Sequence, residues 1–164
     1  MIDKQIALLR KISASIAAIS IIILMIMTVA EVVARTFFSY SFLVVDELSG
    51  YIMAICVFFG LVYSFDSNSF VRVELLYEKY KGLPKKIIDL ILLIILIVYS
   101  YGLNYFMFKL VKSSFLLDST APTILETPIY IPQFITLLGL IIYNLYLLLV
   151  LLKQFQSFGK ENEV

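Results

Sequence analysis

Four long apolar runs divide this chain, and none of them contains Asp, Glu, Lys or Arg. They cover residues 12–30, 48–65, 90–108 and 133–152. A helix that rises about 1.5 Å per residue needs about 20 apolar residues to cross a hydrocarbon layer about 30 Å thick. Lipid-spanning strands instead alternate in polarity and belong to closed barrels. The pattern therefore predicts an all-α integral membrane protein with four transmembrane helices.

With their flanking residues, the predicted spans cover about 12–36, 47–66, 87–109 and 131–152. They predict one four-helix membrane domain over residues 1–155, followed by a polar cytoplasmic tail at residues 156–164. Pro128 and Pro132 precede the fourth span, where proline is tolerated because the first-turn amides have no helical partner. The first apolar run is longer than that of a signal peptide, so we interpret it as a retained helix.

The distribution of basic residues predicts the orientation. Ten of the 13 Lys and Arg residues precede the first span, separate the second from the third, or follow the fourth. The other three are Arg35, Lys109 and Lys112. Cytoplasmic segments of membrane proteins are enriched in Lys and Arg, so both termini are predicted to face the cytoplasm.

The connection between the second and third spans mixes apolar and charged residues. Residues 68–82 have the composition of an interfacial helix lying along the lipid headgroups, and a short solvated linker explains the same pattern. Basic residues here are candidate contacts with membrane lipid at the cytoplasmic interface. They are Arg72, Lys79, Lys81, Lys85 and Lys86.

Composition excludes several classes of function. Of 164 residues, 62% are hydrophobic and 15% charged, and the mean hydropathy of +0.99 is far above that of soluble domains. A net charge of +1 does not supply the basic field that nucleic-acid binding needs. The chain has no histidine and one cysteine, Cys56, which excludes bis-histidine haem, histidine-ligated zinc, iron–sulfur clusters and an internal disulfide. We expect no cofactor and no enzymatic activity.

Glu31 and Arg35 are the sharpest polar feature within a span. Spaced i and i+4, they share one helix face, so we expect an ion pair that lowers the cost of charge near the membrane edge. Such a pair serves structure or subunit docking. The alternative is a carboxylate that exchanges a proton or binds a cationic substrate. Arg35 argues against it, because a neighbouring cation keeps a carboxylate ionised.

Asp46 and Glu47 stand at the predicted N-terminus of the second span. Carboxylates are stabilised there by unpaired amides and by the helix dipole, so capping explains both residues. The other interpretation makes them a docking point for a protein outside the membrane.

Polar and small residues within the spans predict contacts between helices. Asn104 and Asn144 are placed to hydrogen-bond across a helix interface. Small residues four positions apart let helix backbones approach closely in lipid. Such pairs are Ala14 and Ala18, Gly50 and Ala54, and Cys56 and Gly60.

Several short motifs follow one another in a characteristic order. Arg35-Thr36-Phe37-Phe38 ends the first span, Asp46-Glu47-Leu48 opens the second, and Gly60 lies late in it. A segment from Asn68 to Leu76 and the run Leu83-Pro84-Lys85-Lys86 come next. In these motifs, their spacing and the four-helix topology, most of the chain resembles the small membrane subunit, or Q subunit, of tripartite ATP-independent periplasmic (TRAP) transporters.

The sequence departs from the family pattern at three places. Phe70 stands where the family often has histidine, and Glu74 replaces the usual aspartate. The tryptophan commonly found near the acidic pair is absent, since the chain has none. Roles tied to those side chains are therefore not carried over.

The resemblance implies a non-catalytic subunit of a sodium-coupled secondary transporter in the bacterial inner membrane. In that family, a periplasmic binding protein delivers an organic acid, such as sialic acid or a C4-dicarboxylate, to a large membrane subunit that carries the substrate and sodium sites. The small subunit braces the large one within the bilayer. Arg35, Asp46 and Glu47 match motif positions near the outer face, where they would help to shape the docking surface for the binding protein.

Two other functions are compatible with the residues. An autonomous proton-coupled carrier would work as a homodimer with Glu31 as the exchanging group. A lipid-organising assembly factor would have no link to transport and no large transporter subunit as a partner.

Overall fold

The computed structural model describes residues 2–66, 83–123 and 125–161. They form four helices, α1 (Ile2–Phe38), α2 (Val44–Asp66), α4 (Leu83–Leu116) and α5 (Tyr130–Glu161). Each helix contains a stretch that is long and apolar enough to cross a membrane. The prediction of an all-α membrane protein with four spanning helices is therefore confirmed.

The helices extend beyond the spans predicted from the apolar pattern. Helix α1 begins at Ile2 rather than near residue 12, and α4 ends at Leu116 rather than near residue 109. Helix α5 continues to Glu161, through most of the segment expected to be a polar tail. Lys and Arg are good helix formers whose long side chains reach the headgroups while the backbone stays helical. The apolar pattern thus reports the thickness of the hydrocarbon layer rather than the ends of the helices.

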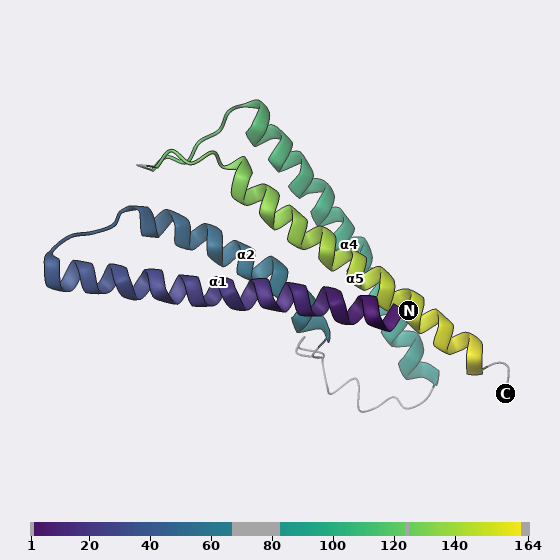
Figure 1. Ribbon diagram of the computed structural model, residues 1–164. Coiled ribbons are helices and arrows are strands. Elements are labelled where there is room, and N and C mark those ends of the chain that lie inside the picture. Colours follow the sequence, from purple (N-terminus) through teal and green to yellow (C-terminus); the bar gives the residue numbers. More distant parts are fainter. Residues whose placement is uncertain (1, 67–82, 124, 162–164) are drawn as a thin grey trace.

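Two antiparallel hairpins make up the molecule. Helix α1 packs along α2, and α4 packs along α5. Helix α5 is the central element, because it contacts α1 and α2 as well as α4. Figure 1 shows the hairpins crossing near the N-terminus and diverging toward their connecting loops. We call the end with the α1–α2 turn (39–43) and the α4–α5 connection (117–129) the loop end, and the opposite end the terminal end.

The best-packed part of the molecule lies where the hairpins cross. A cluster of buried side chains joins α2, α4 and α5 there. Its members are Val62, Leu93, Tyr143, Tyr146 and Leu147. Because lipid tails are as apolar as these side chains, close packing rather than escape from water stabilises such a cluster within a bilayer.

Glycines mark the closest approaches between helices. A Cβ atom at Gly139 of α5 would lie 3.1 Å from the Phe59 ring of α2, so this crossing depends on the missing side chain. A Cβ atom at Gly60 would lie 4.0 Å from the Ala17 Cβ, which places this predicted small residue against α1. Among the described residues, none lies within 4 Å of a Cβ atom at Gly50, so the structure shows no close helix contact there. The crossing at Gly139 was not predicted.

Asn104 and Asn144 join α4 to α5 reciprocally. The Asn104 side-chain amide donates to the carbonyls of Ser100, at 3.2 Å, and Leu140, at 3.5 Å. The Asn144 amide donates to the same two carbonyls, at 3.4 Å and 3.2 Å. Each amide therefore bonds one carbonyl on its own helix and one on its neighbour. This confirms the predicted hydrogen bonds between helices.

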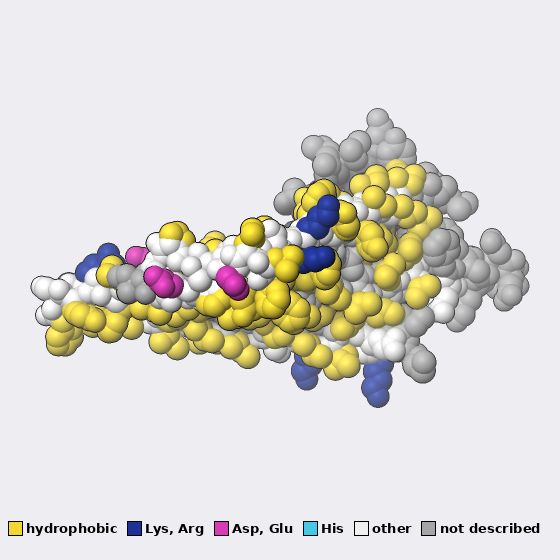
Figure 2. Space-filling model, turned by 90° about the horizontal axis from the view of Figure 1, so that it is seen from above, with side chains coloured by type: hydrophobic (Ala, Val, Ile, Leu, Met, Phe, Trp, Pro, Cys, Tyr) yellow, Lys and Arg dark blue, Asp and Glu magenta, His cyan; other side chains and the backbone are white. Residues whose placement is uncertain are grey.

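Most of the helix surface is apolar and exposed. In α1, α2 and α4, at most 17% of the residues in the most apolar window are buried, against 39% in α5. Figure 2 shows hydrophobic side chains covering much of the visible face. A surface of this kind marks contact with lipid or with another membrane protein.

Candidate functional site

Glu31 and Arg35 form the predicted ion pair near the loop end of α1. Arg35 Nη2 donates to Glu31 Oε1 at 2.7 Å, and Arg35 Nε donates to the same oxygen at 3.1 Å. The Glu31 side chain is 8% exposed, whereas that of Arg35 is 57% exposed. The carboxylate is therefore covered by its partners, while the guanidinium reaches the surface.

Glu31 also closes the turn that follows α1. Ser41 Oγ donates to Glu31 Oε1 at 2.8 Å, and the backbone N–H of Phe42 donates to Oε2 at 2.8 Å. Just after α1 ends, the chain passes through Ser39, whose φ of 51° lies in the left-handed region. Both carboxylate oxygens are occupied by these contacts and by Arg35. The contacts with Ser41 and Phe42 were not predicted.

Asp46 and Glu47 lie in the first turn of α2, which fits the expected stabilisation by the helix dipole. The two side chains differ in their contacts. Glu47 accepts a hydrogen bond from Tyr51 Oη at 2.9 Å and another from Thr123 Oγ1 in the α4–α5 connection. Asp46 is exposed. Glu47 therefore links the two hairpins, and Asp46 is the member of the pair that a second protein can reach.

The α4–α5 connection folds back on itself and presents Thr123 to Glu47. The Ala121 N–H donates to the Thr127 carbonyl at 3.0 Å, and the Ile129 N–H donates to the Ser119 carbonyl at 3.0 Å. Ala121 is buried. The connection is thus held by its own backbone, and it meets α2 at a defined place.

Exposed charges gather at the loop end. The exposed acidic residues there are Asp46, Asp118 and Glu126, and Arg35 is exposed beside them. Figure 2 shows acidic side chains along the left part of the visible face. Charged side chains at this end of the molecule are therefore open to the surroundings.

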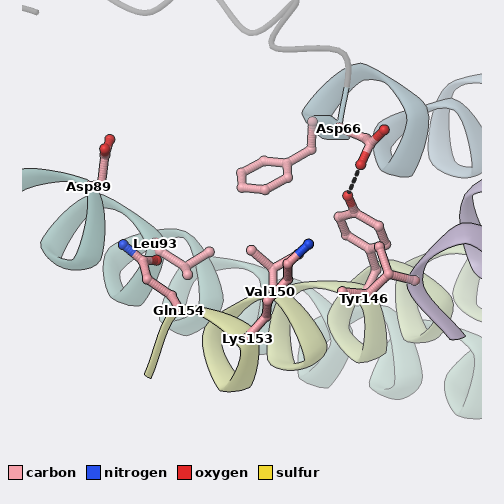
Figure 3. Close-up of a pocket in the computed structure, with 9 residues that line it drawn as sticks. Asp66, Asp89, Leu93, Tyr146, Val150, Lys153 and Gln154 are labelled. Carbon is pink, nitrogen blue, oxygen red and sulfur yellow. Dashed lines mark hydrogen bonds between the residues drawn. The ribbon is translucent and has the colours of Figure 1, made fainter. Parts of the chain in front are cut away.

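A polar cluster that was not predicted joins three helices at the terminal end. Arg10 Nη1 of α1 lies 2.6 Å from Asp66 Oδ2 of α2. Tyr146 Oη of α5 donates to Asp66 Oδ1 at 2.6 Å, the bond drawn in Figure 3. Lys153 of α5 pairs with Asp3 of α1 at 2.6 Å. The signal in the sequence was a carboxylate, Asp66, directly after an apolar run, where it needs a partner.

An open hollow of about 310 Å³ lies beside this cluster. Asp89, Lys153 and Gln154 line it together with Asp66, and apolar walls come from Phe65, Leu93 and Val150, as Figure 3 shows in part. Within the described residues, no three Cys, Asp or Glu side chains gather as metal ligands would.

The structure describes only some of the basic residues that were predicted to contact lipid. Lys85 and Lys86 belong to the first turn of α4. Arg72, Lys79 and Lys81, with the predicted interfacial helix at 68–82, lie outside the described residues. Their contact with lipid stays a prediction.

Comparison with known proteins bears on most of the chain. The family model described as "Tripartite ATP-independent periplasmic transporters, DctQ component" matches residues 24–157. The match includes the Glu31–Arg35 pair, the acidic start of α2 and both Asn residues. Among curated proteins and among solved structures, none matches the chain.

Proposed function

This chain belongs to the DctQ component family of tripartite ATP-independent periplasmic transporters, and we propose that it is the scaffold that holds a large transport subunit in the bilayer. In this proposal, a periplasmic binding protein delivers an organic acid, such as sialic acid or a C4-dicarboxylate, to the complex. Uptake is coupled to sodium, and the substrate and sodium sites lie in the large subunit. The chain itself catalyses no reaction.

The observation that supports a scaffold is the exposed apolar surface of the long helices. Exposed side chains follow α1 over its whole apolar stretch, including Ile19, Ile22, Met25, Ile26 and Val29. Four continuous helices with so little mutual burial leave broad faces for a larger membrane protein. A fixed subunit with such faces enlarges the footprint of a moving partner in the membrane.

The contacts of Glu31 favour the scaffold over an autonomous proton-coupled carrier. A proton-exchanging carboxylate has to become neutral and lose its partners during each cycle. Both Glu31 oxygens instead bind Arg35, Ser41 and Phe42 and close a turn. Glu31, the residue that the carrier hypothesis requires, therefore has a structural role in these contacts.

We further propose that the loop end docks the periplasmic binding protein. Asp46, Asp118 and Glu126 offer exposed charge there, with Arg35 beside them. Reversing one charge, by Asp46→Lys, should weaken binding of the periplasmic protein to the complex several-fold in surface plasmon resonance, mainly through slower association. An unchanged affinity would contradict the docking role of Asp46.

The proposed location is the bacterial inner membrane, with both termini in the cytoplasm. The start of α1 and the end of α5 lie at the same end of the molecule (Figure 1). Lys4, Arg10, Lys11 and Lys153 lie toward that end, as the positive-inside rule requires. The loop end then faces the periplasm.

Co-purification tests the proposed function. The tagged chain is expressed together with the large transport subunit of the proposed complex, and the detergent extract is purified on the tag. The proposal expects a stable complex in a fixed ratio. A chain that isolates as a stable monomer, with uptake unaffected by its deletion, would refute it.

A further inference from the structure

A groove of about 340 Å³ runs along one side of the α4–α5 hairpin. Its walls are aromatic on α4 and aliphatic on α5. They are formed by Tyr101, Tyr105 and Phe108 and by Leu137, Ile141 and Leu145. Asn104 and Asn144 also line it, and their reciprocal bonds hold the two helices together. The groove is therefore a fixed feature of the hairpin.

The groove is elongated along the helices. From Tyr101 to Phe108, α4 advances two turns, about 10 Å at about 1.5 Å per residue. In the antiparallel α5, the stretch from Leu145 to Leu137 covers a similar length in the opposite sense. The groove thus runs along the hairpin, from the middle of its apolar stretch toward the loop end.

Two lysines stand on the same side of α4, just beyond the groove. Lys109 follows Tyr105 by four residues and Lys112 follows Phe108 by four, and such pairs share a helix face. Lys109 Nζ lies 4.8 Å from the centre of the Tyr105 ring. The charge-free part of this span ends at Phe108, which places both ammonium groups at the edge of the hydrocarbon layer.

Neither lysine has a counter-charge within the part of the chain that the structure describes. Both side chains are exposed, and the ion pairs between described residues involve other groups. An ammonium group at the membrane edge is stabilised by an anion at the same depth. In a bilayer that anion is the phosphate of a lipid headgroup.

We propose that this side of the α4–α5 hairpin binds one anionic phospholipid from the leaflet at the loop end. The headgroup phosphate lies against Lys109 and Lys112, and an acyl chain lies in the groove. The lysines lie toward the membrane edge, where the headgroup of such a lipid lies, and the apolar walls lie deeper, where its acyl chains lie. A neighbouring protein helix would fill the groove but would need its own acidic group beside the lysines.

Tryptophan fluorescence tests this site, because the chain contains no tryptophan. Tyr105→Trp puts a reporter on the groove wall. Tyr99→Trp is the matched control, since Tyr99 is another exposed tyrosine of α4 that lies about a third of a turn away from Tyr105. The full-length chain is reconstituted in vesicles in which either phosphatidylglycerol or phosphatidylcholine carries brominated acyl chains that quench the indole.

The proposal expects a relative affinity for phosphatidylglycerol over phosphatidylcholine of at least about fivefold at position 105, the factor that one lysine contributes near an anionic surface. Position 99 should show a ratio near unity. When Lys109→Gln and Lys112→Gln are added to the Tyr105→Trp variant, the affinity ratio at position 105 should also fall to near unity. Adding Lys109→Arg and Lys112→Arg instead should preserve the preference, which separates loss of charge from misfolding.

Three results would overturn the proposal. Equal quenching by the two lipids at position 105 would exclude a specific headgroup contact. A preference that survives both glutamine substitutions would exclude the lysines as the anchor. Quenching at position 99 with none by either lipid at position 105 would show that protein, such as a second copy of the chain, covers the groove.

Discussion

Glu31 shows how far a single residue can be interpreted from its spacing. Its pairing with Arg35 follows from the i, i+4 register of a helix and was predicted. Its bonds to Ser41 and the Phe42 N–H depend on the path of the chain after the helix ends at Phe38, and helical periodicity carries no information about that path. The structural role was predictable, and its extent was not.

Replacing Glu31 by Gln should loosen the α1–α2 turn and leave transport by the complex in place. Glutamine keeps one acceptor oxygen but loses the charge that binds Arg35, so the melting temperature of the purified complex should fall. The matched control is Glu126→Gln, which makes the same change at an exposed carboxylate outside the helices and should leave the melting temperature unchanged. If Glu31→Gln remains fully folded and loses all coupled uptake, the result would support the carrier hypothesis and contradict the scaffold.

At the scale of elements, four apolar runs were enough to predict four membrane-spanning helices and the all-α class. The contacts between elements were predicted only in part. Asn104 and Asn144 were identifiable because polar groups in hydrocarbon need partners. Tyr146 and Asp66 meet across 80 residues of sequence, and Glu47 meets Thr123 across 76. Such pairings depend on how the hairpins cross, which no local pattern encodes.

The crossing of α2 and α5 at Gly139 gives a test at this scale. Gly139→Ala would place a methyl group 3.1 Å from the Phe59 ring and 3.2 Å from the Phe58 Cβ, so α2 must shift by a few tenths of an ångström, and we expect this overpacking to cost about 1–3 kcal/mol of folding stability. Gly102→Ala is the control, because no residue in the described ranges lies within 4 Å of the added methyl group on α4.

The two glycine variants are compared by chemical unfolding in mixed micelles. We expect Gly139→Ala to unfold at lower denaturant concentration than the native chain, and Gly102→Ala to unfold at the same or a slightly higher one because alanine favours helix. Equal stability of both variants would mean that α2 and α5 do not cross at this residue.

For the whole molecule, the arrangement of the hairpins places the basic helix ends together and the loop end opposite (Figure 1). Class, span number and family were within reach of the sequence, because they depend on composition and on motif order. The divergence of the hairpins and the central place of α5 were not, since all four apolar runs are alike in hydropathy.

Cysteine labelling checks the proposed orientation. After replacing Cys56 by Ala, Glu126→Cys at the loop end should react with a membrane-impermeant maleimide in intact spheroplasts, whereas Gln5→Cys should react only after the membrane is opened. Both positions are exposed, so a difference in reactivity reports the side of the membrane. The reverse pattern would mean that the loop end faces the cytoplasm. It could then not contact the periplasmic binding protein.

Uptake by purified components tests the scaffold role most directly. Liposomes containing the large transport subunit, supplied with the periplasmic binding protein, a sodium gradient and radiolabelled substrate, are compared with and without this chain. We predict concentrative uptake only when the chain is present, and none from liposomes that hold this chain without the large subunit. Full uptake by the large subunit alone, or uptake by this chain alone, would contradict its role as a scaffold.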